Sequence, residues 1–373
     1  MKFNFFHLMP WPYCEEPPTS WPVANGSFDA VKAKALYETY IDAMAYAEEC
    51  GFDWVGCNEH HFSPYGLMSN CNLIGAALVA RTKNIRLGML GNLVPLLNPV
   101  RVAEEYAMID VMSGGRLIAG MMRGIPHEYF SYNINPDESL GRLDEAVRLI
   151  MKCWTSTEPF RWEGTYYNYP SVSIWPRPMQ SPPPILMSAS NPEAAEFAAR
   201  HKAIMGMTLI ADLDVARKNM DHYVKSARSH GWEPTREHML SGHQTVIAET
   251  DEEARAIMSG GLKYFHQVLM RPQREAQTKV LTQTNYYANT EAKQYFDKRL
   301  ATLRERTLEE QIEAGTVLCG SPESVVKQMK NIHKALGHGV INMTMKIGDM
   351  PDAAVKRGME LFRDRVAPHV RDL

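Results

Sequence analysis

Strand-like and helix-like segments alternate along this chain of 373 residues, and no other feature constrains the fold as strongly. Eight apolar segments have the length and composition of buried strands, and each precedes a segment with helical periodicity. The expected strands cover residues 2–9, 52–57, 85–90, 116–122, 185–188, 203–209, 243–248 and 340–345, and the expected helices cover 30–50, 72–81, 99–112, 140–154, 192–200, 212–230, 321–336 and 352–366. This pattern predicts an α/β fold, a (β/α)8 TIM barrel that forms a single domain over residues 1–373.

Two long stretches do not fit the repeating unit. Residues 159–184 are rich in aromatic residues and proline, and they predict a long irregular loop. Residues 249–320, between the seventh strand and its helix, are polar and helix-prone, most clearly over residues 302–311, and they predict a helical insertion after strand seven. Loops of this length are usually lids or binding elements, so we expect the same of these two.

Charge and composition exclude several classes of protein. The formal net charge is −3 without a basic block, which argues against nucleic acid as a partner. No apolar run approaches the ~18 residues of a membrane span, and the N-terminus is too short and polar for a signal peptide. The six cysteines lack CxxC spacing, so they indicate neither a zinc site nor a redox dithiol. We therefore expect a cytoplasmic protein with no membrane partner.

The run Asn58-Glu59-His60-His61-Phe62 directly follows the second expected strand. The carboxyl ends of barrel strands carry the catalytic groups, and imidazole is the side chain whose proton moves most easily near neutral pH. Because adjacent residues of an extended chain face opposite ways, at most one of the two histidines can line a given pocket. Glu59 could orient a histidine or cap a backbone amide. A metal hydrolase is disfavoured because HExxH is absent, and we expect no metal site.

Several short motifs follow one another in a characteristic order. They are the opening MKFNFF, EECGFD at 48–53, NEHHF at 58–62, Gly66, NPVRVAEE at 98–105, SGGRLIAGMMRG at 113–124 and Arg142. This order resembles that of the bacterial-luciferase-like flavin-dependent monooxygenases. The resemblance is strong over residues 1–155, looser over 176–250, and returns at 317–349.

The resemblance implies a two-component monooxygenase that uses reduced FMN and dioxygen in a barrel with an insertion after strand seven. In that family a separate NAD(P)H-dependent flavin reductase supplies the reduced FMN transiently or by diffusion. A flavin C4a-hydroperoxide then inserts one oxygen atom into a small organic substrate, and the other atom leaves as water. Many members are dimers whose interface includes barrel helices two and three, so we expect a homodimer. Hydrocarbons, ketones, amines, sulfonates and aldehydes are all substrates in the family, and the fold does not choose among them.

Family positions carry over to specific residues of this chain. His60 matches the active-site histidine beside the isoalloxazine and would act in general acid–base catalysis, while His61 would be structural. Arg123 and Arg142 match phosphate-binding arginines, whose planar fork suits phosphate oxygens. The alternative for Arg142 is an exposed helix face, paired with an acidic residue at position 144 or 145.

The segment from Ser188 to Pro192 combines hydroxyl groups with the start of a helix, which favours anion binding. The family also places phosphate contacts here, which implicates Ser188 and Ser190; a simple helix cap is the alternative.

Residues 90–92 follow the third expected strand, and the family often has a non-proline cis peptide here that supports the flavin ring. In this chain that peptide would join Leu90 to Gly91, and Asn92 would also contact the cofactor. Such a bond costs ~3–4 kcal/mol and persists only where the surrounding structure holds it.

Further residues could complete a substrate pocket. His127, Tyr129 and Tyr132 follow Arg123 closely and would lie at the mouth of the fourth strand. The aromatic run at 160–167 could shield the site from water, or it could simply pack on the surface. Met122 stands where the luciferase large subunit has a reactive cysteine, which argues against light emission from aldehydes.

Two other functions remain open. One is an oxidoreductase of the same barrel superfamily that uses the deazaflavin F420 for hydride transfer. The second is a non-catalytic flavin-binding subunit, against which the presence of His60, Arg123 and Arg142 argues.

Overall fold

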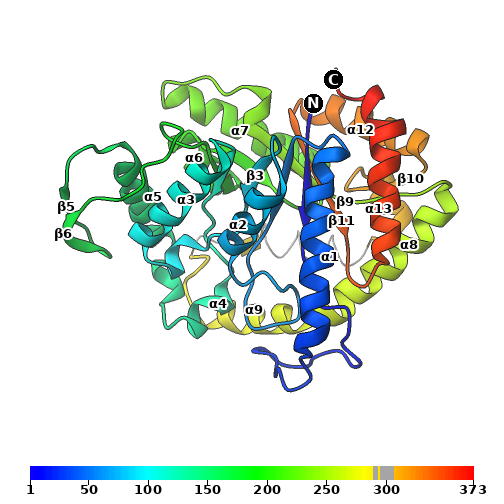
Figure 1. Ribbon diagram of the computed structural model, residues 1–373, viewed down its shortest axis with the longest axis horizontal. Helices are drawn as coiled ribbons and strands as arrows, with labels where there is room; N and C mark the ends of the chain where they lie inside the picture. The colour runs from blue at the N-terminus through cyan, green and yellow to red at the C-terminus, as the bar shows by residue number, and fades with distance from the viewer. Residues whose placement is uncertain (289–292, 295–305) are drawn as a thin grey trace.

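Eight parallel strands close into a barrel in the computed structural model, which describes residues 1–288, 293–294 and 306–373 (Figure 1). Around the barrel the strands run β9, β11, β1, β2, β3, β4, β7 and β8, and β8 pairs with β9 to complete the circle. Their bounds are β1 (Lys2–His7), β2 (Trp54–Cys57), β3 (Arg86–Met89), β4 (Leu117–Gly120), β7 (Ile185–Ser188), β8 (Ile204–Met207), β9 (Met239–Ile247) and β11 (Val340–Lys346). The predicted (β/α)8 fold is confirmed.

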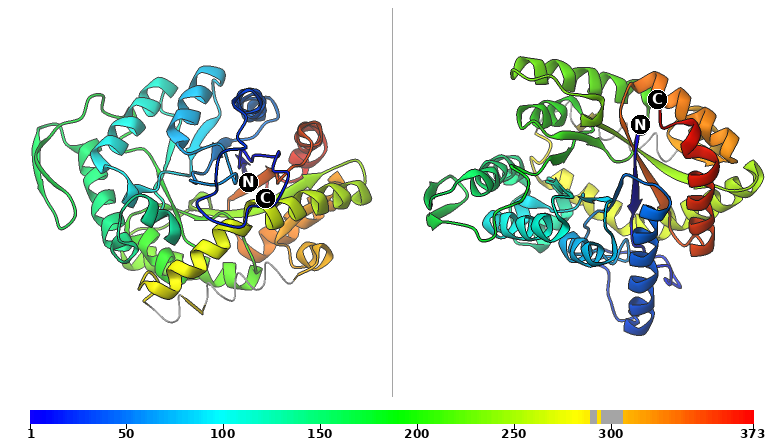
Figure 2. Two further views of the ribbon diagram at one scale, coloured as in Figure 1. Left: turned by 90° about the horizontal axis from the view of Figure 1, so that it is seen from below. Right: turned by 45° about the horizontal axis from the view of Figure 1, so that its top comes forward.

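Helices follow the strands and surround the barrel (Figure 2). Their bounds are α1 (Ala30–Glu49), α2 (Cys71–Arg81), α3 (Pro99–Ser113), α5 (Ser139–Thr155), α6 (Pro192–Arg200), α7 (Leu213–Ser229), α12 (Pro322–Leu336) and α13 (Asp352–Leu361). Side-chain caps explain where several of them begin: Asp29, Asn70 and Asn98 each accept two backbone N–H groups at the start of α1, α2 and α3. No helix in the described part of the chain combines the length and the apolar character needed to cross a membrane.

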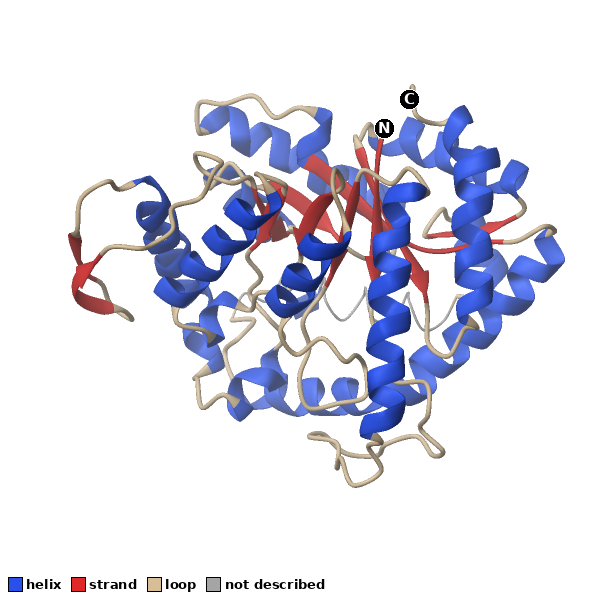
Figure 3. Cartoon of the chain, in the orientation of Figure 1, coloured by secondary structure: helices blue, strands red, loops and turns tan. Residues whose placement is uncertain are grey.

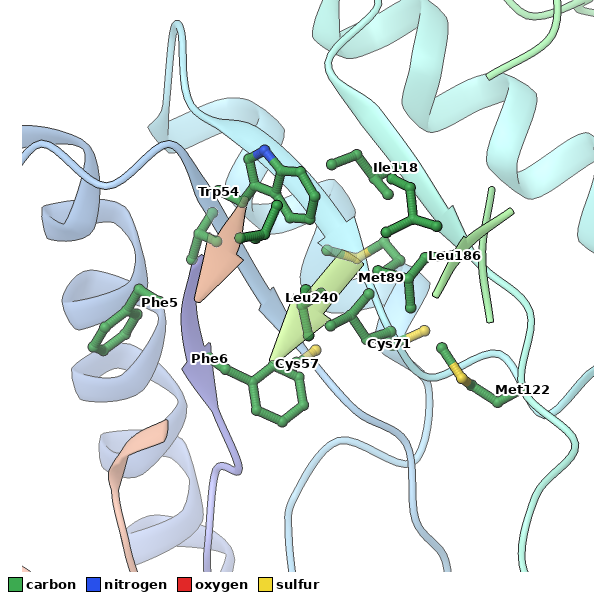
Figure 4. Close-up of a cluster of buried hydrophobic side chains, with 14 of the residues drawn as sticks. Phe5, Phe6, Trp54, Cys57, Cys71, Met89, Ile118, Met122, Leu186 and Leu240 are labelled. Carbon is green, nitrogen blue, oxygen red and sulfur yellow. The ribbon is translucent and has the colours of Figure 1, made fainter. Parts of the chain in front are cut away.

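Apolar side chains fill the barrel and the space between strands and helices (Figure 4). Phe5 and Phe6 are neighbours on β1 and point to opposite sides, Phe5 toward α1 and Phe6 into the barrel. Leu186 of β7 and Met89 of β3 are also buried, and the Met89 sulfur lies against Gly75 of α2. Parallel strands covered by helices on one side and by the barrel interior on the other bury both faces, which explains their nearly continuous apolar sequences.

The two ends of the barrel differ in what they carry. The Met1 amino group lies at the amino end of β1 and contacts the backbone oxygens of Arg371 and Leu373, so both chain termini meet at that end (Figures 1 and 2). The opposite end, where the strands finish, carries the loops that contain the predicted site residues.

Residues 159–184 differ from the predicted irregular loop. They contain an antiparallel hairpin of β5 (Phe160–Glu163) and β6 (Asn168–Val172), which projects beyond α5 (Figure 3). The buried Glu145 carboxylate of α5 holds the hairpin by accepting hydrogen bonds from Trp162 Nε1 (3.1 Å) and from the backbone of Thr165 and Tyr166 (2.9 Å each). Alternation of polar and aromatic residues in this stretch was a strand signal that the prolines obscured.

The insertion after strand seven mixes helix and strand. It contains α8 (Asp251–Tyr264), the π-helical turn η4 (Phe265–Leu269), α9 (Arg271–Gln283), α11 (Leu308–Glu313) and a short strand β10 (Val317–Gly320). The prediction missed β10, which pairs in parallel with the second half of β9 outside the closed circle. β9 also begins at Met239 rather than at residue 243. Of the helix expected over 302–311, residues 302–305 lie outside the described residues.

Three buried histidines link stability to pH. Burial, reinforced by Lys346, lowers the pKa of His7 to about 3; burial lowers the pKa of His243 to about 4 and that of His338 well below its usual value. The unfolded chain binds protons below pH ~6.5, whereas the folded chain does not until these lower values are reached. The free energy of unfolding therefore has its full value above pH ~6.5. We expect it to fall toward pH 4 by up to ~1.4 kcal/mol per pH unit for each histidine.

Urea unfolding at pH 7, 6 and 5 measures this slope. His243→Asn should flatten it, whereas the matched change at the exposed His222, His222→Asn, should leave it as in the wild type. Equal slopes in all three proteins would contradict the assignment to buried histidines.

Candidate active site

The predicted site residues follow four strands that are consecutive neighbours in the barrel. β2 pairs with β3, β3 with β4, and β4 with β7, all in parallel, so their carboxyl ends form one continuous rim. His60 follows β2, Gly91 follows β3, Arg123 follows β4, and Ser188 ends β7. The β3 end therefore lies between the two strand ends that carry His60 and Arg123.

His60 is held by a buried carboxylate that the sequence did not identify. Its Nδ1 lies 3.2 Å from Glu128 Oε1, and the same oxygen accepts a hydrogen bond from the His61 backbone N–H at 3.0 Å. Glu128 lies on the short helix α4 (Pro126–Ser131) and is fully buried, whereas the His60 side chain is 19% exposed. The Tyr65 ring packs edge-on against the other side of the imidazole, with centroids 4.7 Å apart. These contacts fix the orientation of His60.

The charge of Glu128 determines the tautomer of His60. Burial alone would raise the pKa of Glu128, but the charge and hydrogen bond of His60, followed by the charge of His61, outweigh burial and hold that pKa below its usual value. An ionised carboxylate only accepts hydrogen bonds, so Nδ1 of His60 carries the hydrogen and Nε2 is the nitrogen available for chemistry.

His61 faces away from His60, as adjacent residues in extended chain do. It is buried, its Nδ1 lies 2.9 Å from the Tyr132 hydroxyl, and its Nε2 lies 3.5 Å from Glu59 Oε1. The other oxygen of Glu59 accepts the backbone N–H of Cys71 at the start of α2, at 3.1 Å. Both roles considered for Glu59, orienting a histidine and capping an amide, therefore occur.

The segment after β3 differs from its prediction. No cis bond joins Leu90 to Gly91: the cis peptides among the described residues precede Pro22, Pro176 and Pro182, so that expectation is wrong. Gly91 is required instead by close packing of the β2 and β3 ends, because a Cβ there would lie 2.7 Å from the backbone nitrogen of Glu59.

The Asn92 side chain is turned away from the rim. It is buried and exchanges two hydrogen bonds with the Asn72 amide, at 2.7 and 3.1 Å, while Asn72 also donates to Glu105 of α3 at 2.8 Å. The Asn92 carbonyl accepts the backbone N–H of Met122 at 2.9 Å. Asn92 thus joins the ends of β3 and β4, and only its backbone can contribute to a cofactor site.

Arg123 lies where the β4 end meets the insertion. Its Nε donates to Ser139 Oγ and its Nη2 to the Tyr286 carbonyl, both at 3.0 Å, and its guanidinium stacks 4.0 Å from the Tyr286 ring centroid. Nη1 has no hydrogen-bond partner within residues 1–288, 293–294 and 306–373. Tyr129 donates its hydroxyl hydrogen to the Arg123 carbonyl and is completely buried.

Arg142 binds neighbouring side chains through its guanidinium group. Its Nε and Nη2 each lie 2.8 Å from Glu138 one turn earlier, and its guanidinium stacks 5.0 Å from the Tyr166 ring centroid of the hairpin. The considered pairings with Asp144 and Glu145 do not occur: Asp144 binds Arg148, Arg200 and His201, and Glu145 holds the hairpin.

The hairpin does not shield the rim. It packs on α5 and projects away from the barrel in Figures 1 and 2, so the shielding considered for residues 160–167 is wrong and surface packing is correct. Aromatic composition alone could not distinguish the two, because both roles require the same side chains.

At the β7 end, the Ser188 side chain is exposed, while Asn191 caps α6 by accepting the Ala194 N–H at 2.8 Å. Ser190 is partly buried, and its carbonyl accepts a hydrogen bond from Asn219 at 3.0 Å. Met121 N–H donates to the Leu186 carbonyl at 2.8 Å, which brings the chain leading to Arg123 alongside the chain leading to Ser188.

This rim fits the FMN that the sequence motifs imply. Nη1 of Arg123, without a hydrogen-bond partner in the described part of the chain, and the exposed hydroxyl of Ser188 would supply donors for a phosphate group at the β4 and β7 ends. The β3 end offers backbone rather than bulky polar side chains, since Gly91 is small and the Asn92 side chain is directed toward Asn72 of α2. His60 then stands at the β2 end, one strand beyond, where an isoalloxazine ring would reach.

Glu128 was missed because its partner is distant in the sequence. It lies 68 residues after His60, and nothing local in the sequence couples them. A helix start was visible, because Pro126 suits a first helical position, and that signal could have located α4. His127 and Tyr129, named as pocket candidates, are almost fully buried, and Tyr132 is partly buried.

Known proteins share both the sequence pattern and the fold. The model of the luciferase-like monooxygenase family matches residues 22–339. The alkanal monooxygenase alpha chain of Photobacterium leiognathi is 25% identical over 90% of this chain and 94% of its own length. The monooxygenase RslO1 from Streptomyces bottropensis is 27% identical, with a TM-score of 0.75 over 99% of both chains.

A further solved structure shows the fold alone. The oxygenating constituent of 3,6-diketocamphane monooxygenase from Pseudomonas putida, in complex with FMN, has a TM-score of 0.76 at 20% identity, over 99% of this chain and 98% of its own. The family match covers most of the sequence and confirms the resemblance inferred from the motifs. This chain therefore belongs to the luciferase-like monooxygenase family, and it is a monooxygenase, an oxidoreductase enzyme.

Proposed function

We propose that this protein is the oxygenase component of a two-component system, which uses reduced FMN and dioxygen to insert one oxygen atom into a small organic substrate. A separate NAD(P)H-dependent flavin reductase would supply the reduced FMN. The observation that carries this proposal is the position of His60, backed by Glu128, and Arg123 on either side of the β3 end. A relative with the same fold was solved with FMN, which supports this choice of cofactor.

Each end of the cofactor meets a different set of residues. Arg123 and Ser188 bind the phosphate, with Ser190 and Arg142 as more distant contributors, and the backbone of residues 90–92 supports the ring. Bound FMN in its reduced form supplies the electrons for dioxygen activation. The Arg123 fork is already oriented by Ser139 and by the Tyr286 ring, so little conformational entropy is lost when phosphate binds.

His60 acts as a general acid and base through Nε2. Glu128 accepts a hydrogen bond from Nδ1 and thereby stabilises the imidazolium that forms when Nε2 takes up a proton. The chain can thus deliver a proton to the reacting oxygen and recover it for the next cycle. Tyr65 and Glu128 restrict rotation of the ring, so Nε2 stays directed at one place.

The F420-dependent alternative predicts different chemistry. A hydride-transfer enzyme gains nothing from dioxygen, whereas an oxygenase consumes it. Mixing the protein with reduced FMN and oxygen in a stopped-flow instrument should give reoxidation kinetics that differ from those of free reduced FMN. Kinetics identical to free flavin, together with tight F420 binding, would reverse the assignment. The same result without F420 binding would favour a non-catalytic flavin-binding subunit.

An exposed apolar face supports a homodimer. Met108, Val111 and Met112 on α3 are 44%, 39% and 51% exposed, and Leu73 on the adjacent α2 is 70% exposed. Isolated exposed side chains are ordinary, but Met108, Val111 and Met112 share one face of α3, which supports an interface there. The helices α2 and α3 are the second and third barrel helices, which form dimer interfaces in the family, so we infer that a second copy covers them. Sedimentation equilibrium showing only monomer at micromolar concentration would refute this.

A further inference from the structure

Several buried polar atoms close to His60 have no hydrogen-bond partner among the described residues. They are both ring nitrogens of His127, Oε2 of Glu128 and Nε1 of Trp21. The Trp21 and His127 rings pack edge to face with centroids 4.5 Å apart, and His127 precedes Glu128 on α4. His127 is 1% exposed and Glu128 is fully buried. Buried polar groups are nearly always hydrogen-bonded in native proteins, so these atoms indicate a binding partner.

The combination of donors and acceptors restricts what that partner can be. Burial lowers the pKa of His127 to about 4, so at neutral pH its ring is uncharged and offers one donor and one acceptor. Trp21 adds a donor, and Glu128 Oε2 adds an acceptor with negative charge. A carboxylate or phosphate would be repelled by Glu128, which leaves a neutral group that both donates and accepts. A hydroxyl group meets this requirement.

Aromatic side chains lie next to these polar atoms. Trp21 packs on Phe62, and Phe62 packs on Tyr132, with ring centroids 5.8 and 5.5 Å apart. Phe62 has a φ of +57°, in the left-handed region that bulky residues avoid, and its side chain is 42% exposed. Strain of this kind costs ~1–3 kcal/mol and concentrates at binding sites. Trp21, Phe62 and Tyr132 thus present aromatic surface beside the unpartnered polar atoms.

We propose that Trp21, His127 and Glu128 form a substrate subsite for the hydroxyl group of a neutral, planar aromatic compound, whose ring packs against Phe62 and Tyr132. This inference rests on the proposed oxygenase function and names its substrate class. Because Glu128 also holds His60 through Oε1, a hydroxyl bound at Oε2 would sit next to the acid–base group. The subsite therefore couples substrate recognition to the position of His60.

Calorimetric titration with 2-naphthol, with and without FMN, tests the subsite. Two matched probes isolate its features: 2-naphthoate replaces the hydroxyl by an anion, and decahydro-2-naphthol keeps the hydroxyl but removes the aromatic plane. We expect 2-naphthol to bind at least about 10-fold more tightly than either. Trp21→Phe keeps a ring but removes the N–H donor, so it should weaken 2-naphthol binding by about 3–10-fold.

Trp175→Phe is the matched control, because Trp175 also precedes a proline but is 89% exposed, and it should bind 2-naphthol as the wild type does. Binding of 2-naphthoate as tight as that of 2-naphthol, equal affinities in the two tryptophan variants, or no binding of 2-naphthol in either condition would overturn the subsite. The reaction of reduced FMN with oxygen in the same preparation is measured separately. If it is absent while 2-naphthol binds selectively, the oxygenase function fails and the subsite stands.

Discussion

His60→Ala should bind FMN with an affinity within about threefold of the wild type, yet lose at least about 100-fold in oxygenated product formed per dioxygen consumed. General acid–base catalysis typically contributes 10²–10⁴-fold, and Ala cannot transfer protons. Flavin affinity should persist because Arg123 and the β3 backbone are unchanged. The dioxygen that is consumed without forming product should appear as hydrogen peroxide. Product and peroxide are measured together, with a substrate that has been identified because it reduces peroxide release by the wild type.

Two further variants distinguish catalysis from folding. His61→Ala removes the neighbouring imidazole, which bonds Tyr132 and Glu59 instead, and should lower stability more than coupling. Glu128→Gln keeps the size of the side chain but removes the charge that stabilises the His60 imidazolium, and it should lower coupling and shift its pH profile. An unchanged yield of product per dioxygen in His60→Ala would remove this histidine from the mechanism.

Arg123→Met should weaken FMN binding by about 30–100-fold while leaving riboflavin binding nearly unchanged. Charge-assisted hydrogen bonds contribute ~1.5–3 kcal/mol each, and methionine retains apolar contact without donors. Riboflavin lacks the phosphate, so it reports on the ring site alone. Fluorescence titration of both flavins measures the two affinities in one experiment.

A second arginine controls for charge. Arg148 lies on α5, is exposed, and pairs with Asp144, so Arg148→Met should leave both affinities as in the wild type. Equal losses of FMN and riboflavin affinity in Arg123→Met would mean that the variant damages the rim through Ser139 and Tyr286 rather than through phosphate recognition.

Much of the fold could be predicted because its signals are local. Buried strands of four to nine residues appear in the sequence as short apolar runs, and Gly51 and Gly114 mark the ends of α1 and α3 with positive φ. Placing His60, Gly91 and Arg123 at strand ends then required only the barrel, because parallel strands finish on one side. The sequence alone therefore suffices to group these site residues at one end of the barrel.

The remainder depends on contacts between distant segments. The position of Asn92 at a strand end suggests a cofactor ligand. Its side chain instead hydrogen-bonds the Asn72 amide of α2, the preceding helix. Glu128 gave no local sign of bonding His60, and β10 is too short and too far from the expected pattern to be distinguished from its helical surroundings. In each case the deciding partner lies about 20 to 70 residues away, and periodicity carries no information at that range.

A crystal structure of the protein with bound FMN would test the central claim most directly. The account predicts the phosphate within hydrogen-bond distance of Arg123 and Ser188, and the isoalloxazine ring across the β3 end with His60 Nε2 beside it. A flavin bound with its phosphate away from Arg123, or with its ring on a surface that His60 does not reach, would contradict the account.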